Sequence, residues 1–203
     1  NAPRLFDMGG AWHVVTRCDV RARVLADRHY SRQTPGARDF LNNGQTLCMV
    51  TDDALAVWGV LLNRAPNSPE WRWRVAIFRN EPPPGEARPV IQSSELVREG
   101  TDRTYTYWRH HYGGLPEPPL RTEVDRDKTR RKRDPGRCFI KAGWRVVGET
   151  TRGLVLLEAP PPAPLAVSAQ THREGERFDV TVTLARGQDG GASAEARARR
   201  GAQ

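Results

Sequence analysis

Apolar residues in the first four fifths of the chain alternate between strand-like and helix-like spacing. Runs rich in β-branched and aromatic residues predict strands at 12–18, 46–51, 55–62, 71–78 and 120–124. The tight Asp52-Asp53 connection between the second and third runs predicts a hairpin. The run 71–78 alternates Trp and Arg before it becomes fully apolar, which is typical of a strand that passes from a solvated end into a core.

Helical spacing follows two of these strands. Asp19 is a suitable N-cap for a helix over 20–28, whose predicted buried side is Val20, Val24 and Leu25. A second helix is predicted to begin at 93–94, with either serine as its N-cap, and to run past Trp108. Gly100 weakens this second helix by about 1 kcal/mol.

A third, shorter helix is predicted between Asp134 and Gly143. Asp134 suits the N-cap, Pro135 the first helical position and Gly143 the left-handed position that ends a helix. Cys138, Phe139 and Ala142 then share one face. The residues from 144 to 159 predict a closing hairpin.

The element order β-α-β-β-β-α-β-α-β-β predicts an α/β (α+β) fold, with a mixed central sheet flanked by helices. Residues 1–11 form a lead-in, 12–159 the main domain, and 160–203 a Pro-rich linker with a C-terminal extension. Within the extension, 178–184 predicts one added strand, while 187–203 is rich in Gly, Ala and Arg and predicts disorder.

The charge balance bears on partners and location. The 203 residues carry a formal net charge of +8, which favours a polyanionic partner, nucleic acid first, although a generally basic composition is the alternative. Three cysteines without a CxxC pair favour reduced thiols. No run is apolar enough to cross a membrane, and the first residues lack the order of a secretion signal. We therefore expect a cytoplasmic protein with no membrane partner; the oligomeric state stays open.

A basic cluster stands out from this average charge. Its members lie directly after Asp125 and are predicted to contact DNA phosphates, with a solvated charged loop as the alternative: Arg126, Lys128, Arg130, Arg131, Lys132, Arg133 and Arg137.

Four residues could carry chemistry at the ends of elements. His29 and Tyr30, followed by Ser31, end the first predicted helix; imidazole and phenol can bind iron, move protons or stack on a base. The alternative is that His29 interacts with the helix dipole while Tyr30 packs as a lid. Asp125 ends a strand, where it could act as a base, a ligand or a partner of an amine, or could cap the next turn.

The second helix offers a candidate anion site. If its N-terminus faces an anionic donor, Ser93, Ser94 and Arg98 are placed to bind that donor. The alternative for Arg98 is a pair with Glu95 on the same helical face.

The element order over 12–159, ending in a helix whose Ala142-Gly143-Trp144 leads into a hairpin, resembles the GNAT acyltransferase superfamily. Five segments more closely resemble a GNAT-like phage and prophage group, similar to the Mom-type DNA modification proteins: 29–31 (HYS), 93–98 (SSELVR), 122–125 (TEVD), 134–139 (DPGRCF) and 142–144 (AGW). This resemblance implies modification of adenine in phage DNA and protection from restriction, in the cytoplasm of an infected or lysogenic bacterium. It also implies that His29 and Tyr30 act in the reaction, with iron as a possible requirement.

One segment departs from the GNAT pattern. Acyl-CoA-binding members carry Q/R-x-x-G-x-G/A where the fourth strand meets its helix, and here 79–89 lacks the glycine pair. Three consecutive prolines at 82–84 also remove N–H donors that such a cradle needs. Mom-type proteins depart from the cradle as well, so the donor molecule stays open.

Three functions are therefore carried forward. The first is a transferase that modifies a DNA base at the adenine N6 amino group, with the base flipped into a pocket between the 29–30 turn and Asp125. The second is an acetyl-CoA-dependent N-acetyltransferase for a protein, a small amine or a pre-modified base. The third is a non-catalytic DNA-binding protein.

Overall fold

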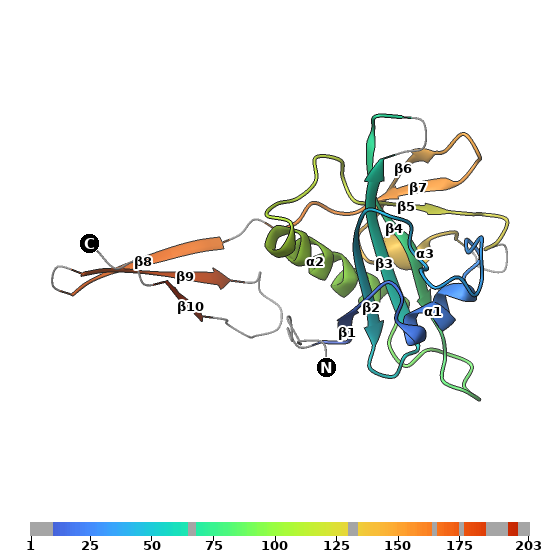
Figure 1. The fold of residues 1–203 in the computed structure, drawn as a ribbon, viewed down its shortest axis with the longest axis horizontal. Helices are drawn as coiled ribbons and strands as arrows, with labels where there is room; N and C mark the ends of the chain where they lie inside the picture. Colours follow the sequence, from blue (N-terminus) through green and yellow to red (C-terminus); the bar gives the residue numbers. More distant parts are fainter. Residues whose placement is uncertain are drawn as a thin grey trace. The chain divides into compact units, whose positions relative to one another are not determined.

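The computed structural model describes residues 10–64, 68–129, 134–163, 166–174, 177–185 and 195–198 (Figure 1). The chain divides into two compact units, Asn1–Pro160 and Pro161–Gln203. In the described part of the chain, no helix combines the length and apolarity needed to cross a membrane.

The first unit is built on a seven-stranded mixed sheet with the order β1-β2-β3-β4-β5-β7-β6. Neighbouring strands are antiparallel, except that β4 and β5 are parallel. The predicted mixed α/β fold and the predicted hairpin of β2 with β3 are confirmed. The strands are β1 Trp12–Val15, β2 Gln45–Thr51, β3 Ala56–Arg64, β4 Trp71–Asn80, β5 Arg121–Val124, β6 Arg145–Glu149 and β7 Val155–Glu158.

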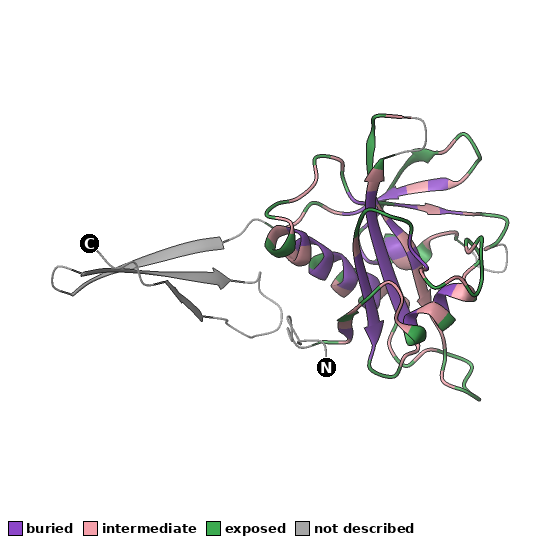
Figure 2. Cartoon of the chain, viewed as in Figure 1, coloured by how far each residue is buried: buried purple, intermediate pink, exposed green. Residues whose placement is uncertain are grey.

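Three helices flank this sheet: α1 Val20–Asp27, α2 Ser93–His111 and α3 Arg137–Lys141. Residues of α2 and α3 share one apolar core with β1–β5 and β7, and we call this side of the sheet the α2 face. Residues of α1 share a second core with Phe40, Leu41 and side chains of β2–β4, and this side is the α1 face. Figure 2 shows the central strands buried between these layers.

The α2 face is organised around Trp58, which is fully buried. Its indole Nε1 donates to Thr104 Oγ1 of α2 at 3.0 Å. A Cβ added to Gly100 would lie 3.0 Å from the Trp58 ring. Gly100 therefore does more than weaken the helix, because it allows α2 to approach the indole closely.

The first helix begins as predicted but buries a different side. Asp19 accepts hydrogen bonds from the N–H groups of Arg21 and Ala22, which confirms it as the N-cap. Val20 and Val24, predicted to be buried, are 61% and 46% exposed. Leu25 is buried as predicted, but its buried neighbours in the helix are Ala22 and Ala26, because two small side chains let the helix lie close to β2–β4.

Helix α2 begins at Ser93, within the predicted range, but the predicted N-caps of the other two helices are wrong. The N-cap of α2 is Gln92, and neither serine caps the helix. The N-cap of α3 is Gly136, so Asp134 and Pro135 precede the helix.

Gly136 holds that position for a steric reason. It has a φ of 75°, and a Cβ there would lie 2.7 Å from Leu157 Cδ1. At the other end of α3, Gly143 follows the C-cap Ala142 with a φ of 93°, as predicted.

Several strand bounds also differ from the prediction by one to three residues. β1 ends at Val15 rather than at residue 18, because the N–H of Asp19 donates to the carbonyl of Thr16 and turns the chain into α1. β4 continues two residues beyond the predicted run, to Asn80. Its exposed Trp71 and buried Trp73 fit a strand that enters the core from a solvated end.

The second unit contains a three-stranded antiparallel sheet in the order β10-β9-β8. Its strands are β8 Ala166–Glu174, β9 Arg177–Ala185 and β10 Glu195–Ala198. The strand predicted at 178–184 lies within β9. Of the residues predicted to be disordered, 187–203, the structure describes 195–198, which form β10; the others lie outside the described residues.

Candidate functional site

The parallel strands β4 and β5 separate soon after they meet. In the described residues they share one backbone register position, Arg74 with Arg121. Thr122 then bonds to β4 through its side chain, with Oγ1 donating to the carbonyl of Val75 at 3.0 Å. The register of β4 with β3 shifts at this point and leaves Ala76 as an extra residue. Such a bulge bends a strand, so β4 turns away from β5 here.

The predicted His-Tyr pair lies at the end of β5. The Oη of Tyr30 accepts a hydrogen bond from the N–H of Asp125 at 3.4 Å. The ring of His29 stacks on that of Tyr30 with centroids 4.4 Å apart. The Nδ1 of His29 lies 2.8 Å from Ser31 Oγ. The structure therefore brings together the four residues predicted to be catalytic.

Glu81, at the end of β4, holds the His-Tyr turn in place. Its carboxylate accepts from Arg28 Nε and Nη2 at 2.8 and 2.5 Å, and also from Arg79. Arg79 in turn donates to the carbonyl of Arg28 at 2.7 Å. Partial burial would raise the pKa of Glu81, but the hydrogen bonds from the two arginines hold that pKa below its usual value of 4.5.

The loop after the turn has its own support, because Asp27 binds two of its parts. One carboxylate oxygen accepts from Arg32 Nε at 2.8 Å, and the other accepts from the N–H of Gly36 at 2.9 Å. Arg32 also donates to the carbonyls of Ala37 and Asp39. These contacts fix the segment that carries His29, Tyr30 and Ser31.

The sequence analysis did not identify the roles of Arg28, Arg79, Glu81 and Asp27. Arg28 and Glu81 are 53 residues apart, so no local pattern links them. The available signal was weak: Glu81 is an acidic residue placed between a strand and three prolines.

Tyr30 is a neutral phenol at physiological pH. Burial of the hydroxyl raises the pKa of Tyr30 above its usual 10.0, and the nearby Asp125, Cys138 and Glu123 raise it further. The N–H of Asp125 acts in the opposite direction. The side chain as a whole is 40% exposed. Tyr30 can therefore donate a hydrogen bond to an incoming ligand.

The side chain of Asp125 caps the turn that follows β5. Its Oδ1 accepts from the N–H groups of Asp127 and Lys128 at 2.8 and 3.1 Å. This is the structural alternative predicted for Asp125. A carboxylate has about four acceptor positions on two oxygens, so capping through Oδ1 is compatible with a second contact.

The imidazole of His29 is oriented by the backbone of Ser31. The N–H of Ser31 donates to His29 Nδ1 at 3.2 Å, so Nδ1 is the acceptor in this contact. This bond fixes the ring of His29 relative to the turn.

The residues of the predicted anion site make separate contacts. Ser93 Oγ accepts from Asn80 Nδ2 at 3.2 Å, and Asn80 also donates to the carbonyl of Ile91 at 2.9 Å. Arg98 donates to the carbonyl of Lys141 in α3 at 3.3 Å. Ser94 is half-buried in the first turn of α2. The N-terminus of α2 is thus fixed to the end of β4, beside Glu81.

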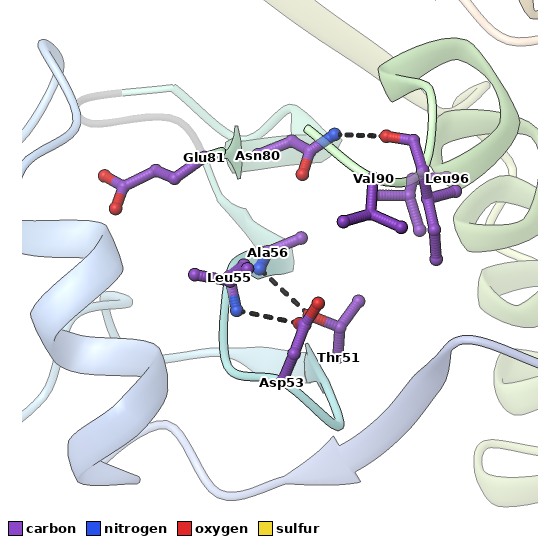
Figure 3. Close-up of a pocket in the computed structure, with 9 residues that line it drawn as sticks. Thr51, Asp53, Leu55, Ala56, Asn80, Glu81, Val90 and Leu96 are labelled. Atoms are coloured by element: carbon purple, nitrogen blue, oxygen red, sulfur yellow. Dashed lines mark hydrogen bonds between the residues drawn. The ribbon is translucent and has the colours of Figure 1, made fainter. Parts of the chain in front are cut away.

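A small pocket lies beside this junction (Figure 3). Its empty volume is about 200 Å³, and Asn80, Glu81, Ile91 and Leu96 are among its lining residues. The carboxylate of Asp53, also in its lining, already accepts from Thr51 Oγ1 and the N–H of Leu55. Its polar groups are therefore used within the protein, and we assign the pocket no ligand.

The described members of the basic cluster are exposed at the surface. Arg126 pairs with Glu149 at 2.6 Å and Arg137 pairs with Asp134 at 3.1 Å. Surface pairs of this kind contribute about 0–1 kcal/mol, so a phosphate can displace them. The N–H of Lys128 belongs to the turn capped by Asp125. Arg130, Arg131, Lys132 and Arg133 lie outside the described residues.

The described side chains do not form a metal centre. Within the part of the chain that the structure describes, no group of three or more His, Cys, Asp or Glu side chains is arranged to hold a metal ion. His29 and Tyr30 provide one nitrogen and one protonated phenol, which do not complete a coordination shell. Iron dependence stays a prediction from the resemblance, and no step proposed below uses iron.

Comparisons with protein-family models, with curated proteins and with solved structures found no match. The resemblance to Mom-type proteins therefore stays a prediction, and the functional argument depends on the site itself.

Proposed function

We propose that this protein is a GNAT-like transferase that modifies a DNA base, at the N6 amino group of adenine, and so protects phage or prophage DNA from restriction. The contact between Tyr30 Oη and the N–H of Asp125 is the main support. It joins two segments 95 residues apart, where β4 and β5 separate. A phenol, an imidazole and a carboxylate are thereby carried by two segments that meet at the end of β5.

The reaction assigns these groups different roles. Loss of a proton from the attacking amine requires an acceptor, and the carboxylate of Asp125 supplies it. The imidazole of His29, whose Nδ1 accepts from the N–H of Ser31, contacts the molecule that supplies the transferred group. The neutral phenol of Tyr30 orients the base by a hydrogen bond or by stacking. The donor molecule is unidentified, so no covalent step is assigned to it.

Access to the amine requires the base to leave the duplex. Base-modifying enzymes rotate the target nucleotide into a pocket at a cost of a few kcal/mol, which contacts to the flanking backbone offset. The cluster that begins at Arg126, directly after Asp125, supplies positive charge beside the site. This proximity supports DNA as the substrate.

The test is the nucleoside composition of DNA from cells that express the protein, measured by mass spectrometry. We expect a modified adenosine with the wild-type chain and at least ~100-fold less with Tyr30→Phe, which removes only the hydroxyl. Tyr112→Phe is the matched control, because the hydroxyl of Tyr112 bonds to the carbonyl of Thr46, on a different strand. Unmodified DNA with the wild-type chain under several growth conditions would sink the proposal.

One observation favours the second function, an acetyl-CoA-dependent N-acetyltransferase. The N-terminus of α2 is fixed to the end of β4 through Asn80 and Ser93, and a helix N-terminus is suited to a pyrophosphate. Calorimetry with acetyl-CoA separates the two functions, since micromolar binding would support the second. A non-catalytic DNA-binding protein would show DNA binding and no change of phenotype with His29→Ala.

A further inference from the structure

Four arginines lie together on the part of the α1 face that α1 does not cover. In β4, Trp73 and Val75 point into the core of the α2 face, so Arg72 and Arg74 point to the other side. Helix α1 packs on β2, β3 and β4, and the short strands β5, β7 and β6 continue the sheet beyond them (Figure 1). We call Arg72, Arg74, Arg121 and Arg145 the arginine face.

Three of these arginines stand in one row across four strands. Arg74 is the register partner of Arg121, and both Arg121 and Arg145 are register partners of Glu158. Register partners point to the same face of a sheet. With adjacent strands about 4.8 Å apart, the row from β4 to β6 spans about 14 Å.

The shared carboxylate orders two of the arginines without neutralising the face. Glu158 accepts from Arg145 Nη2 at 2.5 Å and from Arg121 Nη2 at 3.0 Å. The hydrogen bond from Arg145 lowers the pKa of Glu158, and Arg121 lowers it further, so the carboxylate is ionised at neutral pH. The two arginine side chains are nevertheless 74% and 44% exposed. Glu158 thus contacts two of the four guanidinium groups of the arginine face.

Arg74 supplies a second observation that indicates a ligand. Its Nε is buried and has no hydrogen-bond partner among the residues that the structure describes. A buried donor without a partner is costly, and an external acceptor would remove that cost. Guanidinium groups bind phosphate oxygens through two parallel hydrogen bonds, which makes phosphate a suitable acceptor.

We propose that the arginine face binds the phosphate backbone of the DNA that flanks the base at the Tyr30 site. This inference rests on the proposed function for the identity of its ligand. Arg121 and Asp125 lie four residues apart along β5, or about 13 Å. That distance equals the rise of about four base pairs, at 3.4 Å each, along the axis of a DNA duplex. A duplex that follows β5 can therefore contact both places at once.

The charges along β5 give this placement a direction. Glu123, two residues after Arg121, points to the same face and lies near Tyr30, as does Asp125. These carboxylates disfavour a phosphate directly beside the Tyr30 hydroxyl, while the arginines attract phosphates at the start of β5. This difference in charge along β5 favours a position of the DNA backbone on top of the arginine row. The space beside Tyr30 then stays open for a base. A single pyrophosphate would occupy only a part of the 14 Å row, so an extended polyanion fits the face better.

The experiment is the salt dependence of binding to a short labelled DNA duplex, followed by fluorescence anisotropy. Loss of one phosphate contact lowers the slope of log K against log salt concentration by about 0.9. We expect the double variant Arg72→Gln/Arg74→Gln to lower the slope by about 1.8 and Arg145→Gln by about 0.9. Arg109→Gln, on helix α2 over the other face, is the matched control and should leave the slope unchanged.

Thermal unfolding of each variant checks that it is folded. If the double variant does not fold, the slope of Arg145→Gln decides the test, because the side chain of Arg145 is largely exposed and its replacement should not unfold the protein. Wild-type slopes in the folded variants overturn this inference, and so does a wild-type protein that binds no DNA at low salt. Lower slopes without a modified nucleoside would support DNA binding by the arginine face and contradict only the proposed base modification. Modified DNA with unchanged slopes would contradict DNA binding by the arginine face and support the base modification.

Discussion

The two faces of the sheet differ in what covers them. On the α2 face, five of the six tryptophans are buried in one core: Trp12, Trp58, Trp73, Trp108 and Trp144. On the α1 face, one short helix packs on β2–β4 through small side chains. The part of this face that the helix does not cover carries the arginine face. Strand β4 takes part in both surfaces, with Trp73 on one and Arg74 on the other. The difference indicates that the larger apolar core lies on the α2 face, while charged side chains remain on the part of the α1 face beyond the helix.

Removal of the central tryptophan should have the largest effect. Trp58→Ala deletes a fully buried indole and leaves Thr104 without its hydrogen-bond donor, so we expect the free energy of unfolding to fall by about 4 kcal/mol. Trp71→Ala is the control, since Trp71 is 49% exposed and stacks only with Arg64 in the described residues. Its expected loss is less than about 1 kcal/mol in urea denaturation. Equal losses for the two variants would contradict the assignment of the main core to the α2 face.

A methyl group added to the α2 face should also destabilise the protein. Gly100→Ala improves helix propensity by about 1 kcal/mol but places the new Cβ 3.0 Å from Trp58. Because Trp58 is fixed by Thr104, we expect a net loss of about 1–2 kcal/mol in the same denaturation experiment. Gly114→Ala is the control, since a Cβ there meets nothing within 4 Å in the described part of the chain. A gain in stability for Gly100→Ala would mean that the α2 face is loosely packed.

The α1 face should respond to pH through the Glu81 cluster. Because the folded-state pKa of Glu81 lies below its usual 4.5, the carboxylate stabilises the fold above about pH 4.5, and this contribution is lost as the pH falls through the lower, folded-state value. Glu81→Gln should cost about 1 kcal/mol at pH 7, allowing for the partly exposed arginines, and almost nothing in strong acid. Thermal unfolding across this range gives the comparison, with Glu86→Gln on the exposed part of the loop as control. A difference between Glu81→Gln and wild type that persists unchanged in acid would exclude this cause.

Local patterns in the sequence predicted the strands and the hairpin because alternation and turn residues act over a few positions. They also predicted the cap at Asp19 and the end of α3 at Gly143, where a single residue carries the signal. They failed for the buried side of α1, because Val20 and Val24 are apolar but the sheet lies against Ala22 and Ala26. They failed for the start of α3 because the side chain of Leu157, a residue on another element, leaves no room for a Cβ at position 136.

The site shows the same limit. His29 and Tyr30 were singled out mainly by the resemblance and Asp125 by its place after a strand, yet the bond between Tyr30 and Asp125 spans 95 residues. Glu81 and the arginine face had no local signature, since their roles depend on neighbours supplied by other strands. Arg72 and Arg74 looked like the solvated end of a strand, and only the register with β5 and β7 makes them part of a larger surface.

The single register position that joins β4 to β5 has a consequence for cooperativity. The sheet consists of two hydrogen-bonded ladders, β1–β4 and β5–β7, whose connection depends on one backbone position and on side chains of the shared core. Opening can therefore begin at this seam at less than the free energy of global unfolding. Amide protons of β5 should then exchange faster than those at the centre of β3, as expected if local opening begins at the seam beside Tyr30.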